Sequence, residues 1–170
     1  MKLSPLQVAR YQYQPKLPGM LRNGISDISV KEGQETQSVA DQEKIKSLFP
    51  DTYGKKEITF VKGTNTSQNK KQVVGVILSG GQAPGGHNVV CGLYDALKAT
   101  NPDNVLYGFK NGPSGLIEDN YVVFDDEFIN QYRNTGGFDI IGSGRTKLET
   151  VEQFEVASEV CKKHGITAIV

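Results

Sequence analysis

The chain is poor in cysteine: it has only Cys91 and Cys161, which lie far apart. A disulfide framework or a zinc site needs more ligands at closer spacing, so we interpret both residues as small buried thiols in a reducing compartment. The chain has no excess of positive charge, since 19 basic and 19 acidic side chains give a formal net charge of zero. This balance argues against a general nucleic-acid binder.

The sequence also lacks an apolar run long enough to span a bilayer, and its start has no charged segment followed by an apolar one. A membrane-spanning helix and a secretory leader are therefore not expected. With 37% hydrophobic and 22% charged residues over a length of 170, the composition is that of a globular protein rather than a disordered or fibrous one. We expect a cytoplasmic protein that binds neither a membrane nor nucleic acid.

Residues 1–72 are polar and irregular, and they hold four of the seven prolines. In this part, residues 38–50 have the clearest helical pattern, with Ser38 as the cap. Residues 57–61 fit a short strand, and residues 62–71 fit an exposed loop. We interpret this part as a partly helical amino-terminal extension and linker.

Residues 73–170 alternate between apolar runs and amphipathic segments. The expected strands are residues 73–78, 104–109, 138–142 and 166–170, and the expected helices are residues 87–100, 125–135 and 150–165. This order predicts an α/β fold of three layers, Rossmann-like, with a mostly parallel sheet and helices on both faces. At the start of the last helix, Thr150 and Gln153 have the spacing of a capping box. Because the last expected strand reaches Val170, we expect a fragment whose α/β domain, residues 73–170, is incomplete.

In parallel sheets, ligands bind beyond the carboxyl ends of the strands. The loop after the first expected strand, SGGQAPGGHN at residues 79–88, contains four glycines. Glycine lets backbone N–H groups approach a bulky anion, and a following helix adds a favourable field, so the loop is a candidate phosphate site. Taken alone, a tight turn that uses glycine for positive φ explains it equally well. The loop has neither the Lys-Ser/Thr of a Walker A motif nor the G-x-G-x-x-G spacing of a dinucleotide fold.

A second loop, GSGRTKLET at residues 142–150, brings two cations to the same expected edge. The guanidinium of Arg145 can bind a phosphate through two parallel hydrogen bonds, and the ammonium of Lys147 adds a point charge. The alternative for each is a solvated surface cation. We favour that alternative for Lys147 taken alone and favour anion binding for Arg145.

These loops resemble those of a known family. LSGGQAPGGHN resembles the G-G-D-x-P-G-x-N loop of the phosphofructokinases, and GFDIIGSGR with TKLET resembles that family's second phosphate loop. The pattern fits the long, pyrophosphate-dependent branch best. GFKNGPSGL and the opening ARYQYQPKLPGML also resemble stretches of that branch. Several motifs in the right order, over roughly the whole chain, are more specific than any one of them.

The resemblance implies a glycolytic phosphotransferase that moves a phosphoryl group from pyrophosphate to fructose 6-phosphate, reversibly and with magnesium. Gly80, Gly81 and Gln82 would bind pyrophosphate, Gly81 through its backbone. Arg145 would stabilise charge on the donor and on the transferred group, and Lys147 would assist. Gln82 takes the place of an acidic residue that is common in the ATP-using branch.

By the same resemblance, essential parts lie beyond residue 170. The magnesium ligand belongs to a GGD-x-S motif, and the general-base aspartate belongs to a P-K-T-x-D-x-D motif. We therefore expect this chain alone to be inactive, and the full-length protein to be an enzyme of at least two identical subunits. An ATP-dependent phosphofructokinase and a non-catalytic regulatory subunit of the same fold are the alternatives.

The remaining polar candidates are interpreted as structural. His87 could donate to a phosphate, but we favour a role in ordering its own loop or capping the helix. Asn88 is a candidate helix cap, and His164 suits the end of the last helix. Asp119 is assigned no chemistry. Asp139 is placed at the amino edge of its expected strand, away from the ligand site.

Overall fold

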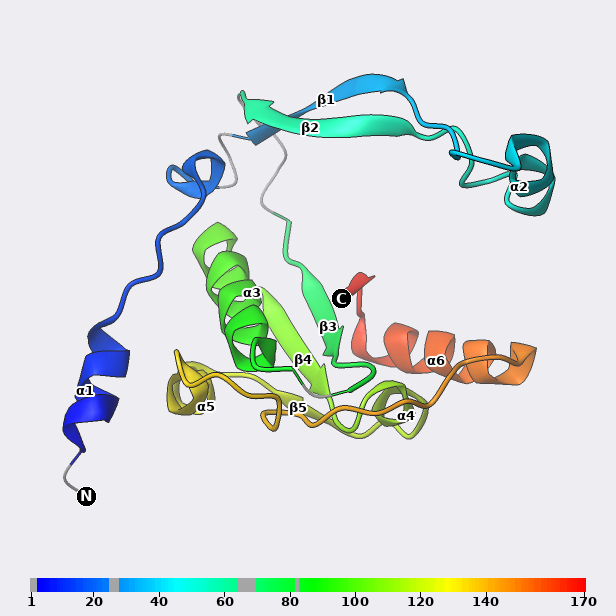
Figure 1. Cartoon of the computed structure of the whole chain (residues 1–170). Coiled ribbons are helices and arrows are strands. Elements are labelled where there is room, and N and C mark those ends of the chain that lie inside the picture. The colour runs from blue at the N-terminus through cyan, green and yellow to red at the C-terminus, as the bar shows by residue number, and fades with distance from the viewer. Residues whose placement is uncertain (1–2, 25–27, 64–69, 82) are drawn as a thin grey trace. The chain divides into compact units, whose positions relative to one another are not determined.

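The structure, a computed structural model, describes residues 3–24, 28–63, 70–81 and 83–170 (Figure 1). The chain divides into two compact units: unit 1 comprises Met1–Pro15 and Asn69–Val170, and unit 2 comprises Lys16–Gln68. Most of the loop expected at residues 62–71 lies outside the described residues. The separation of an extension, residues 1–72, from a donor-binding domain, residues 73–170, stays a prediction about function.

Unit 1 is built on a four-stranded sheet in the order β5-β4-β3-β6. Strand β3 (Val73–Ile77) pairs in parallel with β4 (Val105–Phe109) on one side and with β6 (Ala168–Ile169) on the other. Strand β5 (Tyr121–Val123) is antiparallel to β4 and was not predicted. The sheet is therefore mostly parallel, as expected, and β3 lies inside it.

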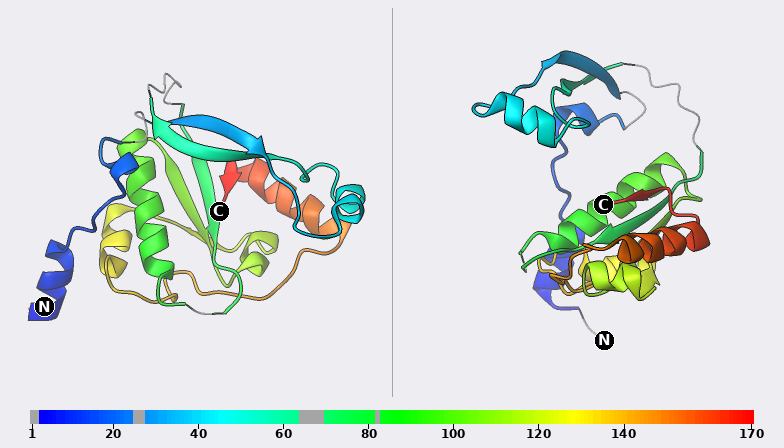
Figure 2. Two further views of the ribbon diagram at one scale, coloured as in Figure 1. Left: turned by 45° about the horizontal axis from the view of Figure 1, so that its top comes forward. Right: turned by 90° about the vertical axis from the view of Figure 1, so that its right-hand side faces the viewer.

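Helices cover both faces of this sheet, as Figures 1 and 2 show for α3 and α6. On one face lie α3 (Gly86–Thr100) and α5 (Asp126–Tyr132), and on the other lie α4 (Pro113–Ile117) and α6 (Val151–His164). Alternate side chains of the strands supply the two cores. The larger core comprises Val74, Val76, Leu78, Val90, Cys91, Tyr94, Leu106, Phe124, Ile129, Ile140 and Ile141, and the smaller one comprises Phe109, Leu116, Ala157 and Val160. The predicted three-layer α/β fold is confirmed.

The ends of α6 follow local chemistry. Thr150 Oγ1 accepts a hydrogen bond from Gln153 N, and the Gln153 side chain accepts one from Thr150 N, which confirms the predicted capping box. Gly165 ends the helix in the left-handed conformation, with φ of 65°. Both signals lie within a few residues of the helix, which is why the sequence alone identified them.

Residues 138–142 do not form the expected strand. Strand β5 occupies the free edge of β4, and Gly137 and Gly142 have φ angles of 121° and 66°. An extended strand excludes such positive φ angles. The segment is instead an irregular loop that buries Ile140 and Ile141 in the larger core.

Helix α1 (Pro5–Gln12) belongs to unit 1 and was not predicted. Ser4 caps its start through a capping box. At its other end, the Asn134 side-chain amide donates to Arg10 O at 2.8 Å and to Tyr13 O at 3.1 Å. These bonds fasten α1 to the loop that follows α5.

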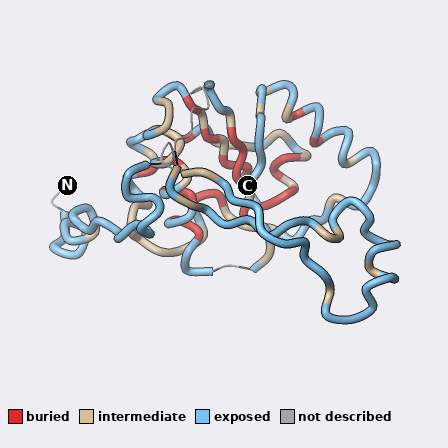
Figure 3. The backbone as a smooth tube through the Cα atoms, turned by 90° about the horizontal axis from the view of Figure 1, so that it is seen from above, coloured by how far each residue is buried: buried red, intermediate tan, exposed pale blue. Residues whose placement is uncertain are grey.

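Unit 2 has a simple organisation. It contains an antiparallel hairpin of β1 (Ile28–Glu35) and β2 (Lys56–Lys62), a helix α2 (Gln42–Leu48) and a 3₁₀ turn η1 (Gly19–Leu21). Strand β2 was predicted and β1 was not. None of its described residues is buried, whereas the buried residues gather in unit 1 (Figure 3).

The predicted cap of α2 was wrong. The helix begins at Gln42 with Asp41 in the cap position, and the Ser38 hydroxyl donates instead to Ala40 O at 2.9 Å. The serine thus closes a local turn that competes with the helix. No helix in the described ranges is long and apolar enough to cross a membrane.

Candidate functional site

The glycine loop after β3 meets the loop after residues 138–142 through the backbone. Gly80 N donates to Gly144 O at 2.9 Å, and Gly144 N donates to Leu78 O at 3.3 Å. These bonds pair Ser79 with Gly144 as an isolated parallel bridge. Gly80 has φ of 94°, a value that favours glycine. The structure thus brings together the two loops that the sequence analysis expected at one edge of the sheet.

A third loop, after β4, contacts the same place. Asn111 N donates to Ile141 O at 2.8 Å. A Cβ on Gly144 would lie 2.1 Å from Asn111 O, and a Cβ on Gly112 would lie 2.5 Å from Gly144 N. Glycine at both positions therefore permits the close approach of two backbones. Sequence reasoning missed this contact, although Asn-Gly after a strand is a turn signal.

Arg145 ends next to the glycine loop. A Cβ on Gly81 would lie 3.3 Å from Arg145 Nη2, so the guanidinium lies within contact range of the Gly81 backbone. Arg145 is exposed and makes no hydrogen bond or ion pair with other described residues. Gly81 N likewise donates to no acceptor among the described residues. A guanidinium with free donors beside a free backbone N–H can bind a phosphate-type anion.

The other two expected ligands do not join this pair. The Lys147 side chain is 79% exposed and lies 3.6 Å from the Glu149 carboxylate. None of its contacts within the described ranges involves Gly81 or Arg145, so its role stays a prediction. Gln82 lies outside the described residues.

Helix α3 begins one turn earlier than a cap at Asn88 would allow. Gly85 occupies the cap position and has no side chain to cap with, so the prediction for Asn88 was wrong. The helix start is held instead by His87 N, which donates to Gly137 O at 3.0 Å. The glycine loop therefore leads directly into the helix, and its end is bound to the irregular loop.

His87 does not order its own loop, as the sequence suggested, but holds residues 135–140. Only 3% of His87 is exposed. Its Nδ1 lies 2.8 Å from Thr135 Oγ1, and its Nε2 lies 2.7 Å from Asp139 Oδ1. Asp139 was expected at the far edge of a strand. Because that strand does not form, its carboxylate reaches the start of α3.

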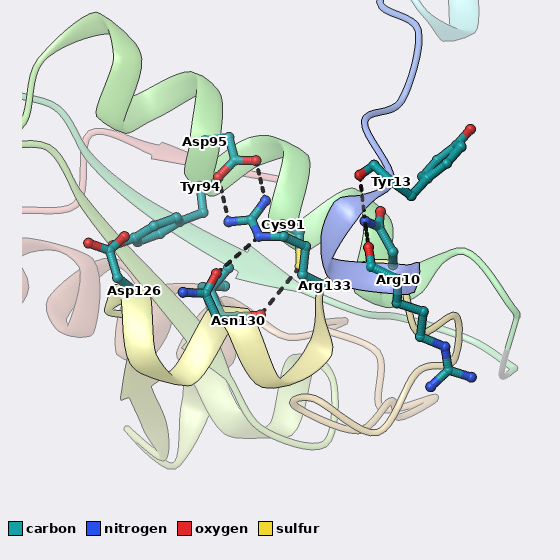
Figure 4. Close-up of polar contacts among 10 residues, drawn as sticks. Arg10, Tyr13, Cys91, Tyr94, Asp95, Asp126, Asn130 and Arg133 are labelled. Carbon is teal, nitrogen blue, oxygen red and sulfur yellow. Dashed lines mark hydrogen bonds and ion pairs between the residues drawn. The ribbon is translucent and has the colours of Figure 1, made fainter. Parts of the chain in front are cut away.

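A polar cluster fixes α5 against α3 (Figure 4). The Arg133 guanidinium donates to both carboxylate oxygens of Asp95, at 2.5 and 2.9 Å, and this hydrogen bonding raises the pKa of Arg133. The Tyr94 hydroxyl donates to Asp126 Oδ1 at 3.0 Å. Burial raises the pKa of the Cys91 thiol, so Cys91 is neutral at physiological pH. Both cysteines are free, as expected, and Cys91 is buried while Cys161 is partly buried.

The sequence is similar to known proteins over its whole length. The phosphofructokinase family model matches residues 73–170. The chain is 51% identical over 170 residues to a pyrophosphate–fructose 6-phosphate 1-phosphotransferase of Porphyromonas gingivalis, covering 100% of the chain and 30% of that protein. It is 40% identical over 179 aligned positions to a protein of the same name from Treponema pallidum, covering 100% of the chain and 31% of that protein. The chain thus spans about 30% of the length of these relatives.

A solved structure is similar in fold. The pyrophosphate-dependent phosphofructokinase of Marinobacter aquaeolei matches with a TM-score of 0.50 and 22% sequence identity, covering 58% of the chain and 25% of that protein. At this identity the likeness concerns the fold alone.

Proposed function

Since the chain belongs to the phosphofructokinase family, we propose that the full-length protein containing it transfers a phosphoryl group from pyrophosphate to fructose 6-phosphate. The product is fructose 1,6-bisphosphate, and the step is reversible. The relatives from Porphyromonas and Treponema are named for this reaction. The observation that carries the proposal is the Arg145 guanidinium beside the Gly81 backbone, two groups whose donors have no partner among the described residues.

The three loops have different tasks in this proposal. Gly81 N and Arg145 bind pyrophosphate directly, and Arg145 stabilises the charge that develops during transfer. Gly80 shapes the loop, because its N–H already donates to Gly144 O. Gln82 and Lys147 complete the set of ligands. Phosphoryl transfer depends mainly on the positioning of donor and acceptor and on stabilisation of the negative charge in the transition state. Backbone N–H groups and cationic side chains provide both.

Magnesium fits the reaction, but the described residues include no cluster that would hold it. The ion would neutralise charge on the phosphoryl groups. No three His, Cys, Asp or Glu side chains of the described ranges come together as a metal site. On the family's motifs, we propose that the magnesium ligands and the general base lie outside residues 1–170, and that this chain alone does not turn over substrate.

The donor is tested with the full-length protein, magnesium and fructose 6-phosphate in a coupled assay that compares pyrophosphate with ATP. Turnover with pyrophosphate supports the proposal, and turnover with ATP alone would assign the protein to the ATP-dependent branch. In the active protein, Arg145→Ala is expected to lower kcat/KM by on the order of a hundredfold or more. Lys147→Ala is expected to lower it by less, because the Lys147 ammonium lies near Glu149. Lys44→Ala, which removes an exposed cation of α2, is the control and should leave kcat/KM unchanged.

We also propose that the full-length protein is a cytoplasmic oligomer of at least two subunits. Two free cysteines are consistent with a reducing compartment. Potato proteins named as the beta and alpha subunits of this phosphotransferase are 41% and 34% identical to the chain, so a non-catalytic subunit is the second candidate. It predicts no turnover with either donor, and stimulation of a catalytic partner. Size-exclusion chromatography with light scattering tests the oligomeric state.

A further inference from the structure

His87 is a buried polar residue at the end of the glycine loop. Its Nδ1 lies 2.8 Å from Thr135 Oγ1, and Thr135 Oγ1 in turn lies 2.6 Å from Tyr132 O. Its Nε2 lies 3.2 Å from Ile140 N. Every partner of the imidazole thus belongs to α5 or to the irregular loop that follows it, up to 53 positions further along the chain.

The backbone strengthens the same connection. His87 N donates to Gly137 O at 3.0 Å, and Gly137 N donates to Pro84 O at 2.9 Å. Gly137 has φ of 121°, and a Cβ there would lie 2.8 Å from His87 Cε1. The irregular loop therefore rests directly on the imidazole and on the end of the glycine loop, with no room for a side chain between them.

This loop leads into the residues of the candidate site. Ile140 and Ile141 are followed by Gly142, Gly144 and Arg145. Because the expected strand does not form, no continuous ladder of hydrogen bonds fixes this segment. It is held at its start by His87 and further along by Asn111 N to Ile141 O and by the Gly80–Gly144 bonds.

We propose that His87 is a positioning residue: its imidazole holds the Ile140 amide and so determines where Arg145 lies relative to Gly81. This inference rests on the proposed donor site. The Thr135 hydroxyl, which lies 2.8 Å from Nδ1, donates to Tyr132 O, and Nε2 faces both Ile140 N at 3.2 Å and Asp139 Oδ1 at 2.7 Å.

The ring is held from further sides as well. Its Nε2 lies 2.7 Å from Oδ1 of Asp139, whose side chain is 80% exposed. The Tyr132 ring of α5 packs against the imidazole edge to face, with ring centroids 4.9 Å apart. The buried imidazole therefore contacts both the end of α5 and the segment that leads to Arg145.

Amide hydrogen exchange of the full-length protein, without pyrophosphate, tests the positioning itself. In His87→Phe, exchange of residues 140–145 is expected to be about tenfold faster than in the wild type, the scale of one lost hydrogen bond. His87→Gln offers a side-chain oxygen to the Ile140 amide and should restore most of the protection. His164→Gln is the control for loss of a histidine and should leave these residues protected. Equal exchange in the folded wild type and His87→Phe would overturn the proposal.

Rescue by His87→Gln is a readout that a merely structural role would not move. If His87→Phe does not fold, His87→Asn takes its place, because its amide is one methylene shorter than that of His87→Gln and does not reach the Ile140 amide. Equal exchange of residues 140–145 in the wild type, His87→Gln and a folded His87→Asn would contradict the proposal.

Calorimetric titration with pyrophosphate separates this inference from the proposed function. If His87→Phe raises the Kd for pyrophosphate about five- to tenfold, both stand. If the wild type binds no pyrophosphate but residues 140–145 still respond to His87, the proposed donor fails and the positioning role stands. If the wild type binds pyrophosphate and neither exchange nor Kd responds to His87, the positioning role fails and the proposed function stands.

Discussion

Arg145 Nη2 lies 3.3 Å from the position that a Cβ on Gly81 would occupy. An alanine at residue 81 would therefore press on the far end of a flexible side chain and not on backbone. We expect Gly81→Ala to fold normally and to displace Arg145, which should weaken pyrophosphate binding to the full-length protein about tenfold. Gly92→Ala in the exposed part of α3, where a Cβ meets nothing within 4 Å, is the control. Calorimetric titration of both variants checks this, and equal affinities would contradict it.

Gly144→Ala is expected to act on stability rather than on binding alone. Its Cβ would lie 2.1 Å from Asn111 O, so two backbones would have to separate. Such overpacking costs about 1–3 kcal/mol. Urea unfolding should show this loss, whereas Gly19→Ala, whose Cβ meets nothing within 4 Å, should be close to neutral. An unchanged unfolding midpoint for Gly144→Ala would mean that the loops are not in contact.

Asp119 links the end of α6 to the loop after α4. Its carboxylate accepts from Lys163 Nζ at 2.6 Å and lies 2.7 Å from His164 Nε2. The hydrogen bond from Lys163, with that of His164, lowers the pKa of Asp119. The ionised Asp119 therefore contributes to the free energy of unfolding above about pH 3.9, the pKa of an unfolded aspartate. This contribution is lost as the pH falls through the lower pKa of the folded state. Asp119→Asn should lower the free energy of unfolding at neutral pH and flatten its decline in acid.

Denaturant unfolding of the wild type and Asp119→Asn from about pH 7 to pH 3 measures this difference. The exposed Asp103→Asn serves as the control for loss of one carboxylate. Parallel curves for the wild type and Asp119→Asn would show that the contact does not contribute.

The contribution of Tyr94 to stability is expected to depend on pH in the opposite direction, with a loss in alkali. Burial, together with the hydrogen bond to Asp126, raises the pKa of Tyr94 to about 12. Its contribution is complete below the unfolded pKa of about 10 and is lost as pH rises through the folded value. Tyr94→Phe should cost about 1 kcal/mol near neutral pH and should lose less stability than the wild type in alkali. Unfolding midpoints at neutral pH and near pH 11 decide this, and equal losses in alkali would refute it.

Asn134 is expected to control the attachment of α1. Its φ of 57° is tolerated by glycine, so Asn134→Gly removes only the side-chain bonds to Arg10 O and Tyr13 O. We expect trypsin to cleave after Arg10 several-fold faster in this variant, because the peptide must leave the surface before it enters a protease. Unaltered cleavage would show that other contacts hold the helix.

The features that the sequence predicted are those whose causes are local. Helix α6 carries its start signal at Thr150 and its stop signal at Gly165, and both act within a few residues. The meeting of the glycine loop with Arg145 was expected from two parallel strand ends. It occurs although residues 138–142 form no strand, because Gly80, Gly144 and Leu78 bond through the backbone.

The features that sequence reasoning missed depend on contacts between residues that are far apart in the sequence. Residues 138–142 are as apolar as a strand, but Gly137 and Gly142 turn the backbone and β5 takes the neighbouring edge. The partners of His87 lie 48 and 53 positions further along. No pattern near a residue reveals such a partner, so only the folded chain identifies it.

The bonds between Gly80, Gly144 and Leu78 are all made by main-chain atoms. Every amino acid except proline can supply such bonds, so the shape of the site does not depend on which side chains stand at Ser79 and Ser143. Gly112 and Gly144, in contrast, leave no space for a larger residue. A saturation mutagenesis screen should therefore find tolerant and intolerant positions next to each other in the same loop. The side chains around the anion can therefore change during evolution while the backbone bonds that hold the loops together stay the same.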